Sequence, residues 1–314
     1  MRVLIATDGS ENAFQAAKLL ARLPHNGPLE VHVLTVIYMP PDDSGGLAYS
    51  WLPEFIEAEE ERARAGFASI AALFSGEEVV TEHLICHGHV GHMITEEANR
   101  LEADLIAIGA QGHSALARVL LGSTSDFVAT QAACSVLAVR PDALAVESAG
   151  MDAATTGIAE VARAERPGPV RIAVAYDGSA PAEAALAEFA QASWGRSVSV
   201  HLVHVLPHAS VFAQASAEDR AAQRAAGETL LYAAADKLRT VAEDVSTHVL
   251  DGASIGQAIV DFAEREGIDI VVLGDTGRSE LSQLFLGSVT RYVLRHATCS
   301  VWISRKRRAE PAEI

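Results

Sequence analysis

Short apolar runs alternate along the chain with longer stretches in which apolar residues recur at a helical period. In the first half, the apolar runs predict strands at residues 3–6, 30–37, 79–86, 104–108 and 135–140. The helical patterns between them predict helices at residues 10–24, 54–74, 91–100 and 123–131. Near-continuous apolar strands that alternate with helices are typical of a parallel sheet covered by helices on both faces.

The same succession of elements restarts near residue 170. It predicts strands at residues 171–176, 197–206, 246–250, 269–273 and 300–304. The helices between them include a long one at 216–243 and another at 288–296. Asp8 and Asp177 are 169 positions apart, and Gly109 and Gly274 are 165 apart. We therefore predict an α/β fold with two tandem, doubly wound, five-stranded parallel-sheet domains. We place the domains at residues 1–141 and 170–306 and a linker at 142–169.

A glycine-rich stretch follows the fourth predicted strand of each half. Its glycines have the same spacing in both copies: Gly109, Gly112 and Gly122 in the first, Gly274, Gly277 and Gly287 in the second. Glycines allow backbone amides to approach a ligand closely, and the helix that follows presents free N–H groups and the positive end of its dipole. The pattern predicts a phosphate-binding loop in each half. No lysine follows the last glycine, so neither copy is a P-loop, and the spacing differs from the dinucleotide-binding fingerprint.

Composition narrows the possible partners and the compartment. The chain has 314 residues and a formal net charge of −17, which argues against a nucleic-acid partner. Its three cysteines do not form a secreted disulfide framework. We find no signal peptide and no stretch of transmembrane length, so we expect a cytoplasmic protein with no membrane partner. The sequence leaves homo-oligomerisation open and indicates no particular protein partner.

Two motifs together carry a family resemblance. Asp8-Gly9-Ser10 after the first strand, and the later pattern Gly-x2-Gly-x9-Gly-Ser, closely resemble the universal stress protein family. Because both motifs occur twice, the chain is similar to the tandem form of that family. The resemblance implies Rossmann-like domains with strand order 3-2-1-4-5 that pair through their last strands with pseudo-two-fold symmetry. It also implies ATP binding and a stress-response or signalling role, since members with this glycine pattern intact generally bind ATP.

The resemblance assigns roles to matching positions in each half. The aspartate would contact the ribose or adenine, the valine would offer backbone groups to adenine, and the remaining residues would hold the phosphates, with Ser125 and Thr290 as further donors. The first-half residues are Asp8, Val36, Gly109, Gly112, Gly122, Ser123 and Ser125, and the second-half residues are Asp177, Val205, Gly274, Gly277, Gly287, Ser288 and Thr290. A carboxylate beside a triphosphate would be repelled, so we expect these aspartates at the sugar or on a bridging Mg²⁺.

Other functions stay open at this point. A slow ATP hydrolase would need a base or a strong cation clamp, and neither loop carries a carboxylate or lysine in both copies: Asp275 aligns with Ala110. We therefore assign no catalytic residue and favour a binding protein over an enzyme. The chain could also be a dimerisation scaffold that binds no nucleotide. The glycines would then serve only as tight turns and the aspartates as helix caps.

Several residues outside the motifs also have side chains that could carry chemistry. His83, Cys86, His87, His89 and His92 suggest a metal cluster, but strand alternation places Cys86 opposite His83 and His87, so we assign no metal site. We expect Cys134 and Cys299 to be buried structural thiols. Arg278 aligns with His113 and is the better candidate to assist phosphate binding. We expect the basic stretch 305–308 to be exposed to solvent.

Overall fold

A computed structural model describes residues 1–23, 25, 27–39, 52–74, 76, 78–110, 121–140, 168–191, 195–207, 216–276 and 286–305. Four residues named above lie outside the described residues: Gly112, His113, Gly277 and Arg278. All but the last two residues of the predicted linker also lie outside them.

The described elements follow one succession in the first half and repeat it in the second. The first half contains β1 (Arg2–Thr7), α1 (Glu11–Arg22), β2 (Leu29–Tyr38), α2 (Leu52–Ala71), β3 (Val79–Gly88), α3 (Val90–Arg100), β4 (Leu105–Gly109), α4 (Ser123–Gln131) and β5 (Ser135–Val139). The second half contains β6 (Val170–Ala175), α5 (Ala180–Phe189), β7 (Gly195–Pro207), α6 (Ala217–Leu238), β8 (Ala242–Gly252), α7 (Ile255–Arg265), β9 (Ile270–Gly274), α8 (Ser288–His296) and β10 (Ser300–Ser304).

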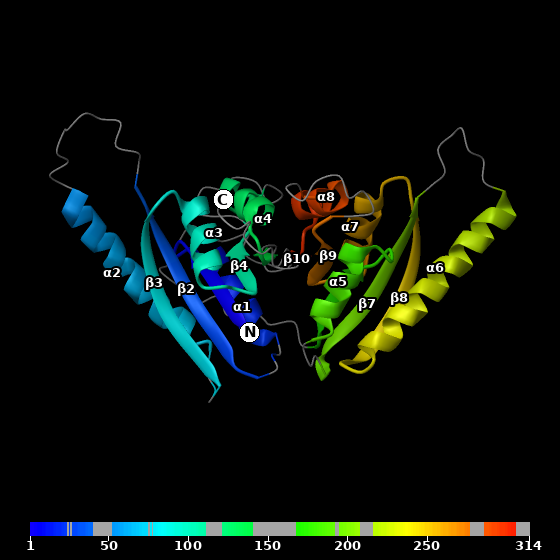
Figure 1. The fold of residues 1–314 in the computed structure, drawn as a ribbon, viewed down its shortest axis with the longest axis horizontal. Coiled ribbons are helices and arrows are strands. Elements are labelled where there is room, and N and C mark those ends of the chain that lie inside the picture. Colours follow the sequence, from blue (N-terminus) through cyan, green and yellow to red (C-terminus); the bar gives the residue numbers. More distant parts are fainter. Residues whose placement is uncertain are drawn as a thin grey trace, which may run out of the picture.

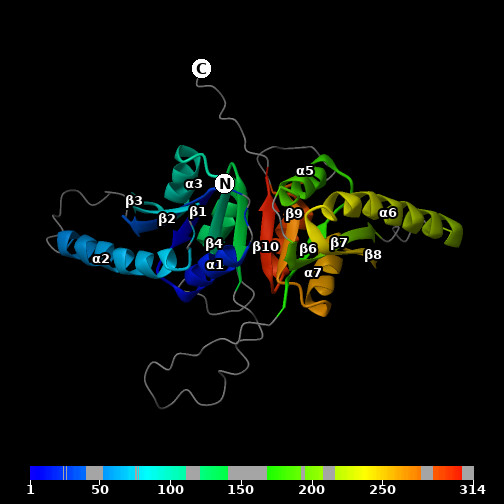
Figure 2. The ribbon, with the colours of Figure 1, turned by 90° about the horizontal axis from the view of Figure 1, so that it is seen from below.

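The described strands form one sheet, in the order β3-β2-β1-β4-β5-β10-β9-β6-β7-β8. Numbered within its own half, each set of five parallel strands has the order 3-2-1-4-5. β5 and β10 pair antiparallel, with Leu137 opposite Trp302, and this pair joins the halves with pseudo-two-fold symmetry (Figures 1 and 2). The predicted fold class, and the pairing through last strands, are confirmed.

Each face of the sheet carries one buried apolar layer that continues through both halves. Val3, Leu20 and Trp302 belong to the layer beneath α1, α2, α5 and α6. Leu4 and Ile259 belong to the layer beneath α3, α4, α7 and α8. Val3 and Leu4 point to opposite faces and are both fully buried, which explains why β1 is apolar throughout rather than alternating.

Serine caps fix where the first helix of each half begins. The Ser10 hydroxyl accepts a hydrogen bond from the Ala13 amide at 3.3 Å, and the Ser179 hydroxyl accepts one from Ala182 at 3.4 Å. Pro181 lies in the first turn of α5, where its missing N–H removes no intrahelical bond. The two helices therefore start immediately after the two aspartates that the sequence analysis singled out.

The predicted end of one helix and the predicted start of the next strand are wrong. The sequence pattern extends the helix now called α6 to residue 243 and starts the following strand at residue 246, whereas α6 ends at Leu238 and β8 begins at Ala242. Residues 239–243 have a composition that a helix tolerates, but Ala242 and Asp244 pair with β7. Pairing along the edge of the sheet therefore overrides the local helix propensity.

Candidate functional site

A cavity lies at the carboxyl ends of the parallel strands in each half. The second-half cavity, of about 760 Å³, has lining residues that include Asp177, Ser179, Val205, Ile255, Gly274, Gly287, Ser288 and Thr290. The first-half cavity, of about 300 Å³, is lined by the matching residues, including Asp8, Ser10, Val36, Val90, Gly109, Gly122, Ser123 and Ser125. Each cavity thus brings together the described residues that the sequence analysis proposed for that half.

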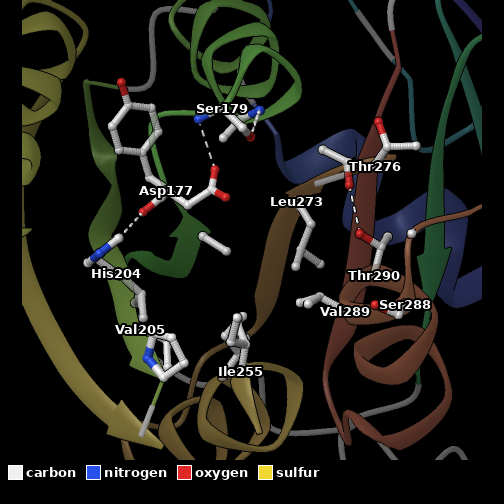
Figure 3. Close-up of a pocket in the computed structure, with 18 of the residues that line it drawn as sticks. Asp177, Ser179, His204, Val205, Ile255, Leu273, Thr276, Ser288, Val289 and Thr290 are labelled. Atoms are coloured by element: carbon white, nitrogen blue, oxygen red, sulfur yellow. Dashed lines mark hydrogen bonds between the residues drawn. The ribbon is translucent and has the colours of Figure 1, made fainter. Parts of the chain in front are cut away.

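Figure 3 shows the arrangement in the second half. Asp177 and Ser179 lie on one side of the cavity, and Ser288 and Thr290 lie across from them at the start of α8. Between these polar sides the lining is apolar, and Val205 and Ile255 belong to this wall. A cavity with an apolar wall and a few polar groups at its ends is suited to a ligand that has a flat apolar part and a charged part.

The aspartates are held by their own turns. The Asp8 carboxylate accepts a hydrogen bond from the Ser10 amide, and Asp177 accepts one from Ser179, each at 3.0 Å. Gly9 and Gly178 supply the left-handed backbone that these turns need, with φ of 76° and 74°. One carboxylate oxygen of each aspartate is thus engaged at the entrance to the helix, and its position in the cavity is fixed.

Gly109 and Gly274 are sites of close backbone approach. A Cβ added at Gly109 would lie 3.0 Å from the carbonyl carbon of Asn12, and one at Gly274 would lie 2.8 Å from backbone atoms of Pro181. These glycines therefore let the end of the fourth strand of each half pack against the start of its first helix. Packing is therefore a sufficient reason for glycine at these two positions. This agrees with the alternative in which the glycines serve only as tight turns and no nucleotide binds.

The two ends of each glycine stretch are tied together by hydrogen bonds. The Gly122 amide donates to the Ala110 carbonyl at 2.8 Å, and the Ser125 hydroxyl donates to the Gly109 carbonyl at 2.8 Å. The second half repeats both contacts, with Gly287 to Asp275 at 2.7 Å and Thr290 to Gly274 at 2.8 Å. Ser125 and Thr290 are nearly fully buried, and their hydroxyl groups join the first turn of each helix to the end of the preceding strand.

Gly122 and Gly287 are the N-caps of α4 and α8. Glycine has no side chain, so neither N-cap residue can occupy the first amides of its helix with a side-chain hydrogen bond. An uncapped helix start leaves backbone donors available for an anion, and the helix dipole favours negative charge at this point. Ser123 and Ser288 are the first residues of these helices and line the two cavities.

Two large side chains line the second-half cavity where the first half has threonines. Tyr176 and His204 line it and stand where the first half has Thr7 and Thr35. His204 Nδ1 lies 2.9 Å from the Tyr176 carbonyl oxygen. The Tyr176 hydroxyl donates to Glu183, and burial together with this hydrogen bond raises the pKa of the phenol. Neither residue belongs to a repeated motif, so the sequence does not predict either one as part of the site.

Arg305, the first residue of the basic stretch 305–308, is buried. Arg305 is 6% exposed, and its guanidinium donates to carbonyls at the end of α4 in the other half. The prediction that Arg305 is exposed to solvent is therefore wrong. The residue is buried because its guanidinium pairs with the other half across the junction. Lys306 and the residues after it lie outside the described part of the chain.

The histidines and cysteines of the sequence analysis take no shared site. Among the described residues, no three His, Cys, Asp or Glu side chains are placed to hold a metal ion. His89 and His92 instead pack as rings, with centroids 5.0 Å apart, and His92 lies against Phe127. Cys134 is buried and Cys299 is half-buried. Desolvation raises the pKa of the Cys299 thiol to about 12, so this thiol is a poor nucleophile at neutral pH.

No helix in the described ranges has both the length and the apolar character needed to cross a lipid bilayer.

Comparison with known proteins gives a consistent result. The family model for the universal stress protein family matches residues 1–140 and 170–305. A universal stress protein of Methanocaldococcus jannaschii is 31% identical over 141 residues, which cover 44% of this chain and 81% of that protein. One from Mycolicibacterium smegmatis is 25% identical and aligns with 97% of both chains.

Solved structures share the fold over the whole chain. A crystal structure of a universal stress protein from Archaeoglobus fulgidus has a TM-score of 0.64 at 22% identity, covering 97% of this chain and 98% of that one. One described as a putative universal stress protein from Pseudomonas aeruginosa has a TM-score of 0.58 at 14% identity, covering 97% and 92%. At these identities the similarity concerns the fold.

Proposed function

The chain belongs to the universal stress protein family, and we propose that each half binds one molecule of ATP, together with Mg²⁺. The observation that carries this proposal is a duplicated cavity that places an uncapped helix start opposite an aspartate, with an apolar wall between them. We assign the two binding domains to residues 1–141 and 170–306 and the linker to 142–169.

The residues of each cavity fit the parts of a nucleotide. In the second half, the amides of the first turn of α8, which begins at Ser288, would bind phosphate oxygens at the positive end of the helix. Asp177 would accept hydrogen bonds from the ribose or hold Mg²⁺, and the apolar wall at Val205 and Ile255 would cover the base. The chain is strongly acidic, so backbone amides and a metal ion are the groups that would balance the phosphate charge.

We propose a binding protein whose nucleotide state changes its conformation or its affinity for a partner, in a stress-response or signalling role. Slow ATP hydrolysis is the alternative, and it would need a free base beside the phosphates. The carboxylate of the second loop, Asp275, instead forms an ion pair with the buried Arg305 at 3.3 Å, and its counterpart is Ala110. This pairing favours the binding role.

Calorimetric titration of the nucleotide-free full chain with ATP and Mg²⁺ tests the proposal. We expect two nucleotides to bind per chain, and no binding in a matched titration with ribose 5-phosphate, which has no base to fill the apolar wall. If no ATP binds, the chain is a dimerisation scaffold whose glycines serve packing alone. Phosphate release in step with binding would support the hydrolase alternative. The cytoplasmic location remains a prediction that fractionation can test.

A further inference from the structure

The Arg305 side chain makes three hydrogen bonds, two of them to the other half. It follows β10 in the second half, yet its Nη2 donates to the Ala129 carbonyl of α4 in the first half at 3.0 Å, and its Nη1 donates to the Ala132 carbonyl. Its Nε donates to the Asp275 carboxylate of its own half at 3.3 Å. The side chain is 2% exposed. One buried guanidinium thus holds the end of a first-half helix and a second-half carboxylate together.

Helix α4 and Asp275, which Arg305 holds together, each connect to one of the two cavities without lining it at the point of contact. Ala129 lies in the last turn of α4 and Ala132 is its C-cap, while the opposite end of α4 is the helix start in the first cavity. Asp275 directly follows Gly274, and its carbonyl accepts the Gly287 amide that begins the helix start of the second cavity. A short chain of contacts therefore runs from the second helix start through Asp275 and Arg305 to α4.

The equivalent chain of contacts from the first half to α8 is weaker. The residue that corresponds to Arg305 is Arg140, 165 positions earlier, and its Nη2 donates to the Leu294 carbonyl of α8 at 2.8 Å. Arg140 has no carboxylate partner within the described residues, since Ala110 stands in the place of Asp275, and burial lowers the pKa of its guanidinium. The two arginines thus reach across the junction in the same way, but only Arg305 is tied to a glycine loop by charge.

We propose that the Asp275–Arg305 pair couples the two nucleotide sites, so that occupancy of the second-half site orders α4 and raises the affinity of the first-half site. This inference rests on the proposed function. Asp275 and Arg305 act as positioning residues and touch no ligand themselves.

The physical basis is the ordering of a shared element. Phosphate at the start of α8 would hold Gly287, whose amide is bonded to Asp275, and this would reduce the motion of Asp275 against Arg305. Arg305 would in turn hold the last carbonyls of α4 more firmly. The first site then binds its nucleotide with less loss of conformational entropy, which is positive coupling. By linkage, the first ligand favours the second equally.

Hydrogen exchange can test the coupling with the first site blocked. In the full chain with Gly122→Val, nucleotide would occupy only the second site, so any effect on α4 must cross the junction. We expect saturating ATP and Mg²⁺ to slow amide exchange in residues 123–131 by about fivefold or more, the lower end of typical coupling factors. Adding Asp275→Ala should remove this effect, while ATP still binds in the second half. Ala110 shows that alanine is accommodated at the equivalent position.

Asp126→Ala is the matched control. The Asp126 carboxylate accepts a hydrogen bond from Arg295 at 3.2 Å, an exposed contact between α4 and α8 that does not involve either glycine loop. Combined with Gly122→Val, it should leave the slowing of α4 exchange intact.

Three outcomes overturn the inference in distinguishable ways. If ATP binds the second half and α4 exchange does not change, the coupling is wrong and the proposed function stands. If Asp126→Ala abolishes the effect as fully as Asp275→Ala does, the coupling passes through the helix pair rather than through Arg305. If calorimetry finds no ATP bound to the Gly122→Val protein, the coupling and the second-half site both fail.

Discussion

The Glu188 carboxylate of α5 accepts a hydrogen bond from the Ser135 hydroxyl of β5 at 2.9 Å, across the junction between the two halves. Ser304 of β10 donates to the same carboxylate. The first half has Leu19 at the equivalent place, so this contact is not duplicated. An acidic group is therefore built into the apolar seam where β5 and β10 meet.

The first prediction concerns this carboxyl group. Burial raises the pKa of Glu188, hydrogen bonds from Ser304 and Ser135 lower it in part, and Asp104 raises it further. The folded state thus holds the proton more tightly than the unfolded chain does. The contribution of protonated Glu188 to the free energy of unfolding is fully present below the unfolded pKa of about 4.3. It is lost as pH rises through the raised pKa of the folded state. We expect Glu188→Gln to be more stable than the parent at pH 8, with the difference shrinking toward pH 4.5.

Thermal unfolding of the two proteins across this range measures that difference. Leu19→Gln, which places an amide at the matching position without an acid to replace, controls for the substitution itself. A difference in melting temperature that does not depend on pH would contradict the assignment.

The second prediction concerns a pair of histidines between β7 and β8. His201 Nδ1 lies 3.1 Å from His248 Nε2, and the Ser246 hydroxyl lies 3.0 Å from both nitrogens. Burial lowers the pKa of both histidines. Arg171 lowers the pKa of His201 further, and Arg265 lowers that of His248. In the opposite direction, Asp244 raises the pKa of His201, and Glu266 raises the pKa of both. In addition, two protonated rings this close would repel each other. The folded state therefore favours neutral rings. Stability should be present above the unfolded pKa of about 6.5 and should fall as pH drops below it.

His248→Leu tests this pair. By strand register His248 corresponds to Leu84, so the first half already carries leucine at this position. We expect the variant to lose less melting temperature than the parent between pH 7.5 and pH 5.5. An equal loss in both proteins would mean that other groups determine the acid sensitivity. His25→Leu, at a residue near the surface, is the control that should change nothing.

How far the sequence predicts this molecule depends on whether a feature is local. The glycine stretch at Gly109 and the Asp8-Gly9-Ser10 turn are local patterns, and both lie at the predicted cavities. Arg305 is the contrary case. Followed by three more basic residues, it has the sequence pattern of an exposed tail, and its partners are the carbonyls of Ala129 and Ala132, which any residue could supply. Backbone acceptors in another domain leave no trace in the sequence near Arg305.

The end of α6 shows the same limit. Nothing between Leu238 and Ala242 breaks a helix, and the strand begins there because β7 offers a pairing edge. Likewise, Tyr176 and His204 enter the second cavity only because their strand ends stand beside it. Repetition revealed what the halves share, and it gave no indication of residues present in one half alone.

The third prediction separates packing from binding at the glycines. Gly274→Ala would place a Cβ 2.8 Å from backbone atoms of Pro181, which cannot move aside as a flexible side chain can. We expect a loss of about 1–3 kcal/mol in the free energy of unfolding, measured by urea titration. Gly66→Ala is the control, because its Cβ would meet nothing within 4 Å inside α2. That change should stabilise the protein by about 0.5–1 kcal/mol. Equal effects at the two positions would contradict the close approach.

The last prediction concerns Gly122, where a side chain should affect binding and leave the fold unchanged. Its φ of −64° and ψ of 149° suit any L-residue, so Gly122→Val introduces no backbone strain. The added methyl groups would stand at the start of α4, where the amides are proposed to meet phosphate. We expect calorimetry to find one ATP per chain instead of two, with the free energy of unfolding changed by less than about 1 kcal/mol. Gly287→Val should mirror this result in the second half, since Gly287 has nearly the same backbone angles. Two intact sites in the Gly122→Val protein would show that the first-half phosphates do not bind at the start of α4.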